Sequence, residues 1–236
     1  MSVSRDVLTL SISDGFETSR FKTNNIIKVT ITPSSRNQIS GVANSGIGNL
    51  VVGPGFLARM FTVSSKGSGN TYVFGLNTQK ARVVSMGATT VLLNGNVSDG
   101  GSLEVDGTSK VYLTGAIGGT LAVNLDYQSS TYVQGTSGTV FRGEMYPLAE
   151  LQYTAGTCRV QAQAPVTPFS LTGAPRCNKV QAGSAPSFTP SWSCGLQVEG
   201  KSVCPSENIH FPDNYTPPEM SVVRVQCLDP SPLNVF

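Results

Sequence analysis

The 236-residue chain carries little charge. Lys and Arg number 16 and Asp and Glu number 14, so charged residues make up 13%, about half the usual share of roughly a quarter. The formal net charge of +2 argues against nucleic-acid binding, because that function needs clustered positive charge. No apolar run reaches the roughly 18 residues that a spanning helix needs, so we expect no membrane insertion. Strong helix formers are scarce, whereas glycine (25) and proline (14) are frequent, which indicates an all-β chain.

The sequence also lacks the residue patterns that catalysis and cofactor binding need. His210 is the single histidine, and it stands without a G-x-S-x-G nucleophile motif. No cysteine pair has the C-x-x-C spacing of a zinc site. A P-loop and a dinucleotide fingerprint are absent as well, since the glycine-rich turns precede strands and not helices. We therefore expect no cofactor, no metal, no catalytic residues and no enzymatic activity.

Cysteine is absent from the first 157 residues. The five cysteines are Cys158, Cys177, Cys194, Cys204 and Cys227, and they lie in a proline-rich region. Such a region is typical of a disulfide-stapled, secreted module. Because five is odd, at least one thiol stays free, pairs between chains, or has its partner outside this sequence. The spacing leaves the connectivity open.

Other signals bear on the compartment. Asn96-Val97-Ser98 and Asn214-Tyr215-Thr216 are N-glycosylation motifs, compatible with secretion and also frequent by chance. The N-terminus has no basic segment followed by an apolar one, so it does not read as a signal peptide. Either such a signal has been removed or the export route is unconventional. We expect an extracellular or cell-surface protein.

What the chain does have is a period of twenty residues. Four similar apolar segments end in glycine, at Gly75, Gly95, Gly115 and Gly135. A second apolar position recurs between them, at Val63, Val83, Leu103 and Val123. Fixed periods near twenty residues are typical of solenoids.

Local alternation identifies the element that repeats. Val111 and Leu113 share one face of their segment and Tyr112 points to the other, which is the period-two pattern of a strand. Residues 121–125 alternate in the same way. Each coil therefore holds two short strands, and stacked coils pair equivalent strands at about 4.8 Å around a column of Val and Leu. The sequence predicts a β-helix-like solenoid.

The period weakens outside these coils. Alternation predicts N-terminal strands within 8–12 and 27–31, a rung at 49–53 one or two residues out of register, and a shortened last coil at 139–143. Twelve of the fourteen prolines and every cysteine follow Met145. We therefore predict a solenoid domain over 1–148 and a Cys/Pro-rich, disulfide-stapled region over 149–236, which is either a small domain or a tail along the solenoid.

The run Phe61–Gly75, with its Gly67-Ser68-Gly69-Asn70 turn, resembles the auto-transporter adhesin head, or GIN domain, of bacterial surface proteins. Later turns, such as Asp106-Gly107-Thr108-Ser109, keep one glycine of that motif. The resemblance covers roughly residues 5–145 and implies a right-handed parallel β-helix at a cell surface, with a presumed role in adhesion. It offers no catalytic residues.

Two columns are candidate sites. Tyr72, Leu92, Tyr112 and Tyr132 are predicted to point outward and to form an apolar stripe. Three interpretations of the stripe stay open. It is an exposed interface or a platform for glycans, or the C-terminal region covers it, or its side chains stack on one another at the surface. A one-residue error in register would place it in the core.

Asp106 and Asp126 lie one coil apart. Stacked carboxylates at that spacing suit a glycosidase pair or a calcium pair. Solvated turn residues are the favoured interpretation, because Asp is common in turns.

The open ends of a solenoid bear on function. Unpaired strand edges invite capping or head-to-tail stacking of subunits. The sequence therefore predicts a structural or adhesive surface protein that forms homo-oligomers or filaments through its ends or the stripe. The alternatives are a glycan-binding module that uses the stripe, or a polysaccharide-active enzyme that uses Asp106 and Asp126 with Glu104 nearby.

Overall fold

The structure is a computed structural model. It describes residues 2–4, 7–9, 29–32, 39–53, 57–163, 176–181, 197–198, 201–202 and 223–226, with side chains over 39–53, 58–163 and 177–181. The chain divides into two compact units, one formed by Met1–Ile31 with Ser191–Gln226 and the other by Thr32–Pro190 with Cys227–Phe236. All regular structure among the described residues is β-strand.

Short strand pairs make up the described part of the first unit. Strand β1 (Ser2–Ser4) pairs antiparallel with β2 (Val7–Thr9), and β17 (Gln197–Val198) with β18 (Lys201–Ser202). Strand β3 (Val29–Thr32), at the border between the units, pairs with β19 (Val223–Gln226). Described strands therefore overlap both predicted N-terminal positions, and β1 and β2 form a two-stranded sheet separate from the solenoid ladder. The predicted domain range of 1–148 stays a prediction.

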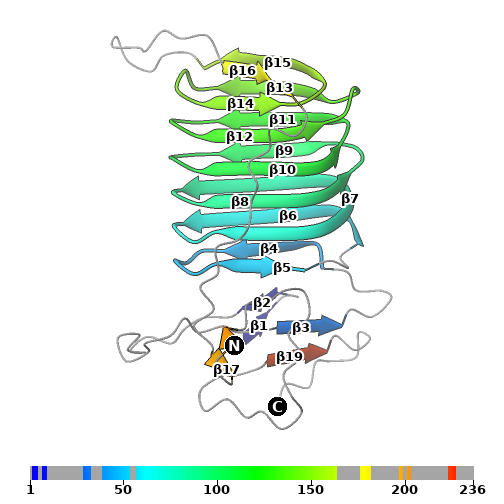
Figure 1. The fold of residues 1–236 in the computed structure, drawn as a ribbon, viewed down its shortest axis with the longest axis vertical. Helices are drawn as coiled ribbons and strands as arrows, with labels where there is room; N and C mark the ends of the chain where they lie inside the picture. The colour runs from blue at the N-terminus through cyan, green and yellow to red at the C-terminus, as the bar shows by residue number, and fades with distance from the viewer. Residues whose placement is uncertain are drawn as a thin grey trace. The chain divides into compact units, whose positions relative to one another are not determined.

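The second unit contains a β-solenoid with two faces, each a ladder of parallel strands (Figure 1). The first face consists of β5 (Leu50–Val52), the start of β7 (Thr71–Gly87), β8 (Thr90–Val97), β10 (Lys110–Ile117), β12 (Ser130–Gly135), β14 (Glu150–Tyr153) and β16 (Arg176–Lys179). The second face consists of β4 (Gly41–Asn44), β6 (Leu57–Gly67), the end of β7, β9 (Gly101–Val105), β11 (Thr120–Leu125), β13 (Val140–Met145) and β15 (Thr157–Ala162).

The interior ladder confirms the predicted period. Val63 pairs with Val83, Val83 with Leu103, and Leu103 with Val123, each partner twenty residues further on. These four side chains are at most 3% exposed. Burying a Val or Leu completely contributes about 1.5–3 kcal/mol, so the column is a large part of what holds the coils together. The out-of-register rung is also confirmed, because Leu50 pairs with Thr71, twenty-one residues on.

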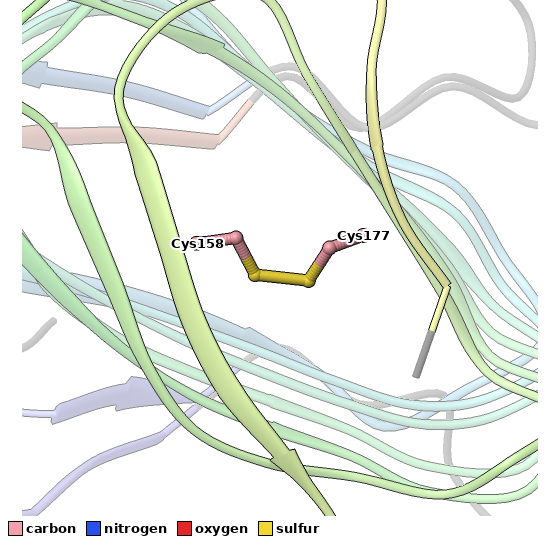
Figure 2. The surroundings of a disulfide bond; sticks show 2 residues. All are labelled: Cys158 and Cys177. Carbon is pink, nitrogen blue, oxygen red and sulfur yellow. A yellow bond between two sulfur atoms is a disulfide. The ribbon is translucent and has the colours of Figure 1, made fainter. Parts of the chain in front are cut away.

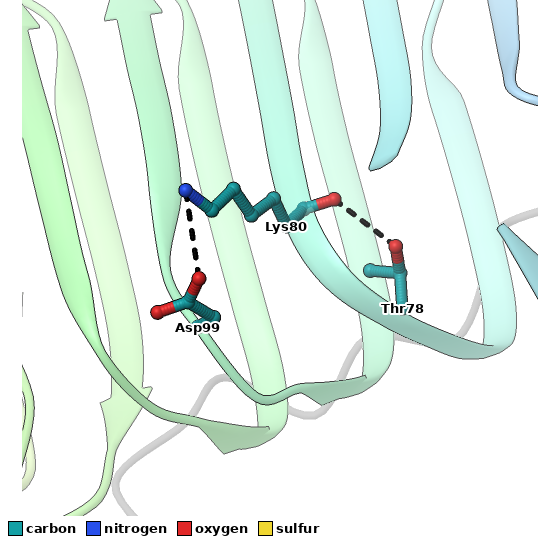
Figure 3. Close-up of polar contacts among 3 residues, drawn as sticks. All are labelled: Thr78, Lys80 and Asp99. Carbon is teal, nitrogen blue, oxygen red and sulfur yellow. Dashed lines mark hydrogen bonds and ion pairs between the residues drawn. The ribbon is translucent and has the colours of Figure 1, made fainter. Parts of the chain in front are cut away.

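The corner from the first face to the second is closed by side-chain and ionic contacts. In β7 the Thr78 hydroxyl donates to the Ala58 carbonyl at 2.6 Å and to the Lys80 carbonyl at 3.1 Å. The Lys80 ammonium lies 3.5 Å from the Asp99 carboxylate of the next coil (Figure 3). Both charged side chains are about half exposed or more, and such pairs contribute only about 0.2–1 kcal/mol. A typical intramolecular hydrogen bond contributes about 0.5–1.5 kcal/mol, so the Thr78 hydroxyl and the ion pair both help to hold this corner.

The ladder continues past the predicted boundary at residue 148. Strand β13 pairs with β15 through Val140 and Thr157, and β14 pairs with β16 through Glu150 and Arg176. The spacing changes to seventeen and twenty-six residues in these last pairs, so the sequence period is lost although the strands still stack. Residues 139–143 accordingly belong to an ordinary coil and are not a shortened last one.

A disulfide closes the last described coil. Cys158 of β15 and Cys177 of β16 are bonded across the interior (Figure 2). Their register partners in the preceding coil are Phe141 and Leu151, both fully buried. A covalent bond thus stands where the preceding coil has packed apolar side chains, at a position where no further described strand follows. The candidates Cys194, Cys204 and Cys227 lie outside the described residues.

Candidate functional site

The predicted aromatic column forms as a stack but is not an open surface. Tyr72, Leu92, Tyr112 and Tyr132 are register partners in successive coils. Their chain neighbours Val73, Leu93, Leu113 and Val133 point into the core, so the column lies on the outer side of the first face. Tyr72 and Leu92 are nevertheless 4% exposed and Tyr132 is 3% exposed. These three side chains are therefore not exposed. The role of the stripe as an interface or a glycan platform stays a prediction, and so does its coverage by the C-terminal region. Tyr112 is partly exposed. Alternation along a strand determines which way a side chain points but not what covers it.

Burial changes the acidity of two of these phenols. Desolvation raises the pKa of Tyr72 above its ordinary value of 10.0, and a hydrogen bond with Asn70 partly opposes that rise. Desolvation also raises the pKa of Tyr112. The folded state therefore holds the neutral phenol more strongly than the unfolded state does.

This shift predicts a loss of stability in alkali. A group whose folded pKa is raised contributes stability that is present below the unfolded pKa and is lost as the pH rises through the folded pKa. We expect the free energy of unfolding to fall above about pH 10, and the fall to be smaller in the Tyr72→Phe/Tyr112→Phe double variant. Urea unfolding followed by circular dichroism across that range measures it. Equal pH dependence of the two proteins would contradict the assignment to these phenols.

The structure brings Asp106 and Asp126 to the same corner, in adjacent coils. They directly follow the register partners Val105 and Leu125. Asp126 accepts hydrogen bonds from Gln163 at 2.6 Å and from Asn124 at 3.5 Å, which is how a structural turn carboxylate is satisfied. Asp106 Oδ1 is buried and has no hydrogen-bond partner. No set of three or more potential metal-ligating side chains gathers anywhere in the described part of the chain.

One turn beside these carboxylates breaks the glycine pattern of the repeat. The same corner position is held by Gly67, Gly87 and Gly107, with φ of 100°, 98° and 78°. In the next coil it is held by Tyr127, with φ of 52°. No other non-glycine residue in the described ranges has a positive φ. The left-handed conformation costs an L-residue with a side chain about 1–2 kcal/mol, so the coil carries strain that glycine would remove.

The ring of Tyr127 stands in solvent beside a second ring. Tyr127 is 64% exposed, and its ring centroid lies 6.0 Å from that of Tyr146 with the planes tilted by 31°. Leu148 next to them is 38% exposed. The three side chains border a shallow hollow of about 250 Å³, which Gly107, Thr108 and Gln128 complete. We call Tyr127, Tyr146, Leu148 and this hollow the aromatic corner.

Sequence reasoning missed the aromatic corner, although a signal for it existed. Position 127 is twenty residues after Gly107 and forty after Gly87, so a large aromatic residue occupies a position where the repeat has glycine.

The remaining sequence candidates fall in different places. Asn96 and Ser98 are exposed on the first face, so that glycosylation motif is accessible, whereas Asn214 and His210 lie outside the described residues. Glu104 lies 3.9 Å from Arg82 in a surface ion pair. Glycosidase chemistry would need a cleft around the two aspartates, and the hollow nearby is bordered by uncharged residues.

Comparisons with protein-family models, with curated proteins and with solved structures gave no significant match to this chain. The resemblance to the GIN domain therefore stays a prediction. Within the described ranges, no helix has the length and apolar character needed to cross a membrane.

Proposed function

We propose that the chain is an extracellular structural and adhesive protein without enzymatic activity. The observation that carries the proposal is the stack of parallel coils whose last described coil is joined by the Cys158–Cys177 bond. Disulfides form and persist in oxidising environments such as the cell exterior. A stack of this kind gives a stiff support whose outward side chains repeat from coil to coil. Such a support suits display of a surface better than it suits a mobile catalytic site.

Self-association through a solenoid end is the second part of the proposal. Strands β4 and β5 pair on one side with β6 and β7, and no described strand pairs with their other side. Ile47, between these two strands, is 89% exposed. A parallel edge that no described strand covers, beside an exposed apolar side chain, favours a head-to-tail contact with another copy.

A charged residue at this end is expected to weaken assembly. We expect Ile47→Lys to shift concentrated protein toward monomer, because head-to-tail stacking would bury the added ammonium. Ala122→Lys is the matched control, since Ala122 is exposed on the side of β11. Size-exclusion chromatography with light scattering and electron microscopy measure the state, and non-reducing electrophoresis detects an intermolecular disulfide. Wild-type protein that stays monomeric at high concentration would refute self-association, and equal effects of both lysines would refute the end as its site.

A further inference from the structure

The aromatic corner has features that the solenoid does not need. A glycine at position 127 would satisfy the turn, as it does at positions 67, 87 and 107. The tyrosine that stands there adds little to the core, because its side chain is largely exposed. Backbone strain of this kind is concentrated at functional positions. A strained turn that holds an aromatic ring in water therefore points to a ligand for that ring.

The geometry of the corner fits a flat ligand with one apolar face. Tyr127 and Tyr146 present two tilted rings, and Leu148 extends the apolar border. Gly107 lies one coil before Tyr127, and its carbonyl accepts a hydrogen bond from the backbone N–H of Gln128 at 3.1 Å. The volume of about 250 Å³ lies below the roughly 300–1,000 Å³ of sites that enclose a whole drug-sized molecule, so the hollow suits a single ring.

The polar groups around the hollow favour a ligand with hydroxyl groups. Thr108 and Gln128 line it and offer both donors and acceptors. A ligand hydroxyl group also donates and accepts, so it can pair with both kinds of group. Asp106 precedes Gly107 in the chain but is not among the residues that line the hollow.

The charges around the hollow narrow the class of ligand further. None of the residues that line the hollow carries a charge, and the residues before Gly107 and Tyr127 are both aspartates. An acidic ligand would be repelled by this pair, since like charges at short range disfavour each other. We propose that the aromatic corner is a binding site for a neutral saccharide, one sugar ring of which stacks on Tyr127 and Tyr146 while its hydroxyl groups bond to the polar rim. This inference gives a ligand class to the adhesive part of the proposed function and does not depend on self-association.

Direct binding of simple glycosides tests the proposal. We expect saturation-transfer NMR to show transfer to the methyl glycosides of glucose or N-acetylglucosamine, and at least about tenfold weaker binding of methyl glucuronide, a difference of about 1.4 kcal/mol. Failure of both neutral glycosides to bind would overturn the proposal. Equal binding of the glucuronide would overturn the assignment to neutral sugars. A protein that assembles but binds no glycoside would leave the self-association proposal standing and would refute this one.

Variants at position 127 separate a binding role from a structural one. We expect Tyr127→Gly to weaken the neutral glycoside at least about tenfold while the thermal midpoint stays equal to or above that of the wild type. We expect Tyr127→Phe to keep the binding, because the ring remains. Met60→Ala, at another exposed apolar residue, is the control and should bind like the wild type. A Tyr127→Gly protein that binds normally, or that loses stability along with binding, would overturn the proposal.

Discussion

Gly115→Val is expected to lower the free energy of unfolding by several kcal/mol. Gly115 has φ of 107°, which valine rarely adopts, and a Cβ at this position would lie 2.1 Å from the Gly95 carbonyl oxygen. The contacted atoms are backbone atoms of the preceding coil, so no side chain can rotate away. Backbone strain of about 1–3 kcal/mol and overpacking of about 1–3 kcal/mol combine here. That sum is a large share of the roughly 5–15 kcal/mol that stabilises a typical domain.

Gly138→Ala is the matched control for this prediction. Its added Cβ would meet no heavy atom within 4 Å, and its φ lies outside the left-handed region. We expect its stability to stay within about 0.5 kcal/mol of the wild type. Urea unfolding followed by far-ultraviolet circular dichroism compares the two. Similar losses in both variants would show that close stacking of coils at Gly115 is not what makes glycine necessary there.

Removal of the Cys158–Cys177 disulfide is expected to destabilise the end of the solenoid. The cysteines are 19 residues apart, and a closed loop of that size corresponds to about 3 kcal/mol in the chain-entropy model. The Cys158→Ser/Cys177→Ser double variant removes both cysteines, so that neither is left as a free thiol. Because each coil contacts only its neighbours, the loss should be greatest near that end.

Amide hydrogen exchange, measured strand by strand, shows which strands lose stability. We expect faster exchange in β15 and β16, a smaller change in β13 and β14, and little change in β8. Arg159→Ala, an exposed substitution on β15, controls for mutation of that strand and should exchange like the wild type. A uniform rise across all coils would show that the solenoid unfolds as one cooperative unit, and unchanged exchange would show that the bond is not needed there.

The central coils were predictable because their length is constant. When Val63, Val83, Leu103 and Val123 recur at equal spacing, periodicity and alternation together determine which strands pair and which side chains are buried. The same reasoning fails at the last coils. There the spacing becomes seventeen and twenty-six residues, and the proline- and cysteine-rich composition begins before the ladder ends. The change of composition therefore predicts a boundary near residue 148, although strand pairing continues across that position.

The candidate site was less predictable because exposure depends on the whole molecule. Alternation correctly gave the direction of Tyr72 and Tyr132, but direction does not determine whether a side chain reaches solvent, and both are buried. Tyr127, in contrast, is exposed. Its exposure follows from the left-handed turn that it adopts, and the pairing of its ring with Tyr146 depends on the exact offset of two turns in adjacent coils. The sequence period predicts neither the exposure of Tyr127 nor the contact of its ring with Tyr146.

Equal coils have a consequence for how such a protein changes over time. Because Lys110 pairs with Thr90 and Ser130 pairs with Lys110, any block of twenty consecutive codons within this stretch begins and ends at equivalent points. In-frame duplication or loss of one block would join compatible strands and would lengthen or shorten the molecule by about 4.8 Å. Unequal recombination between neighbouring blocks is thus a ready source of variants that differ in reach, while the sequences at their ends stay the same.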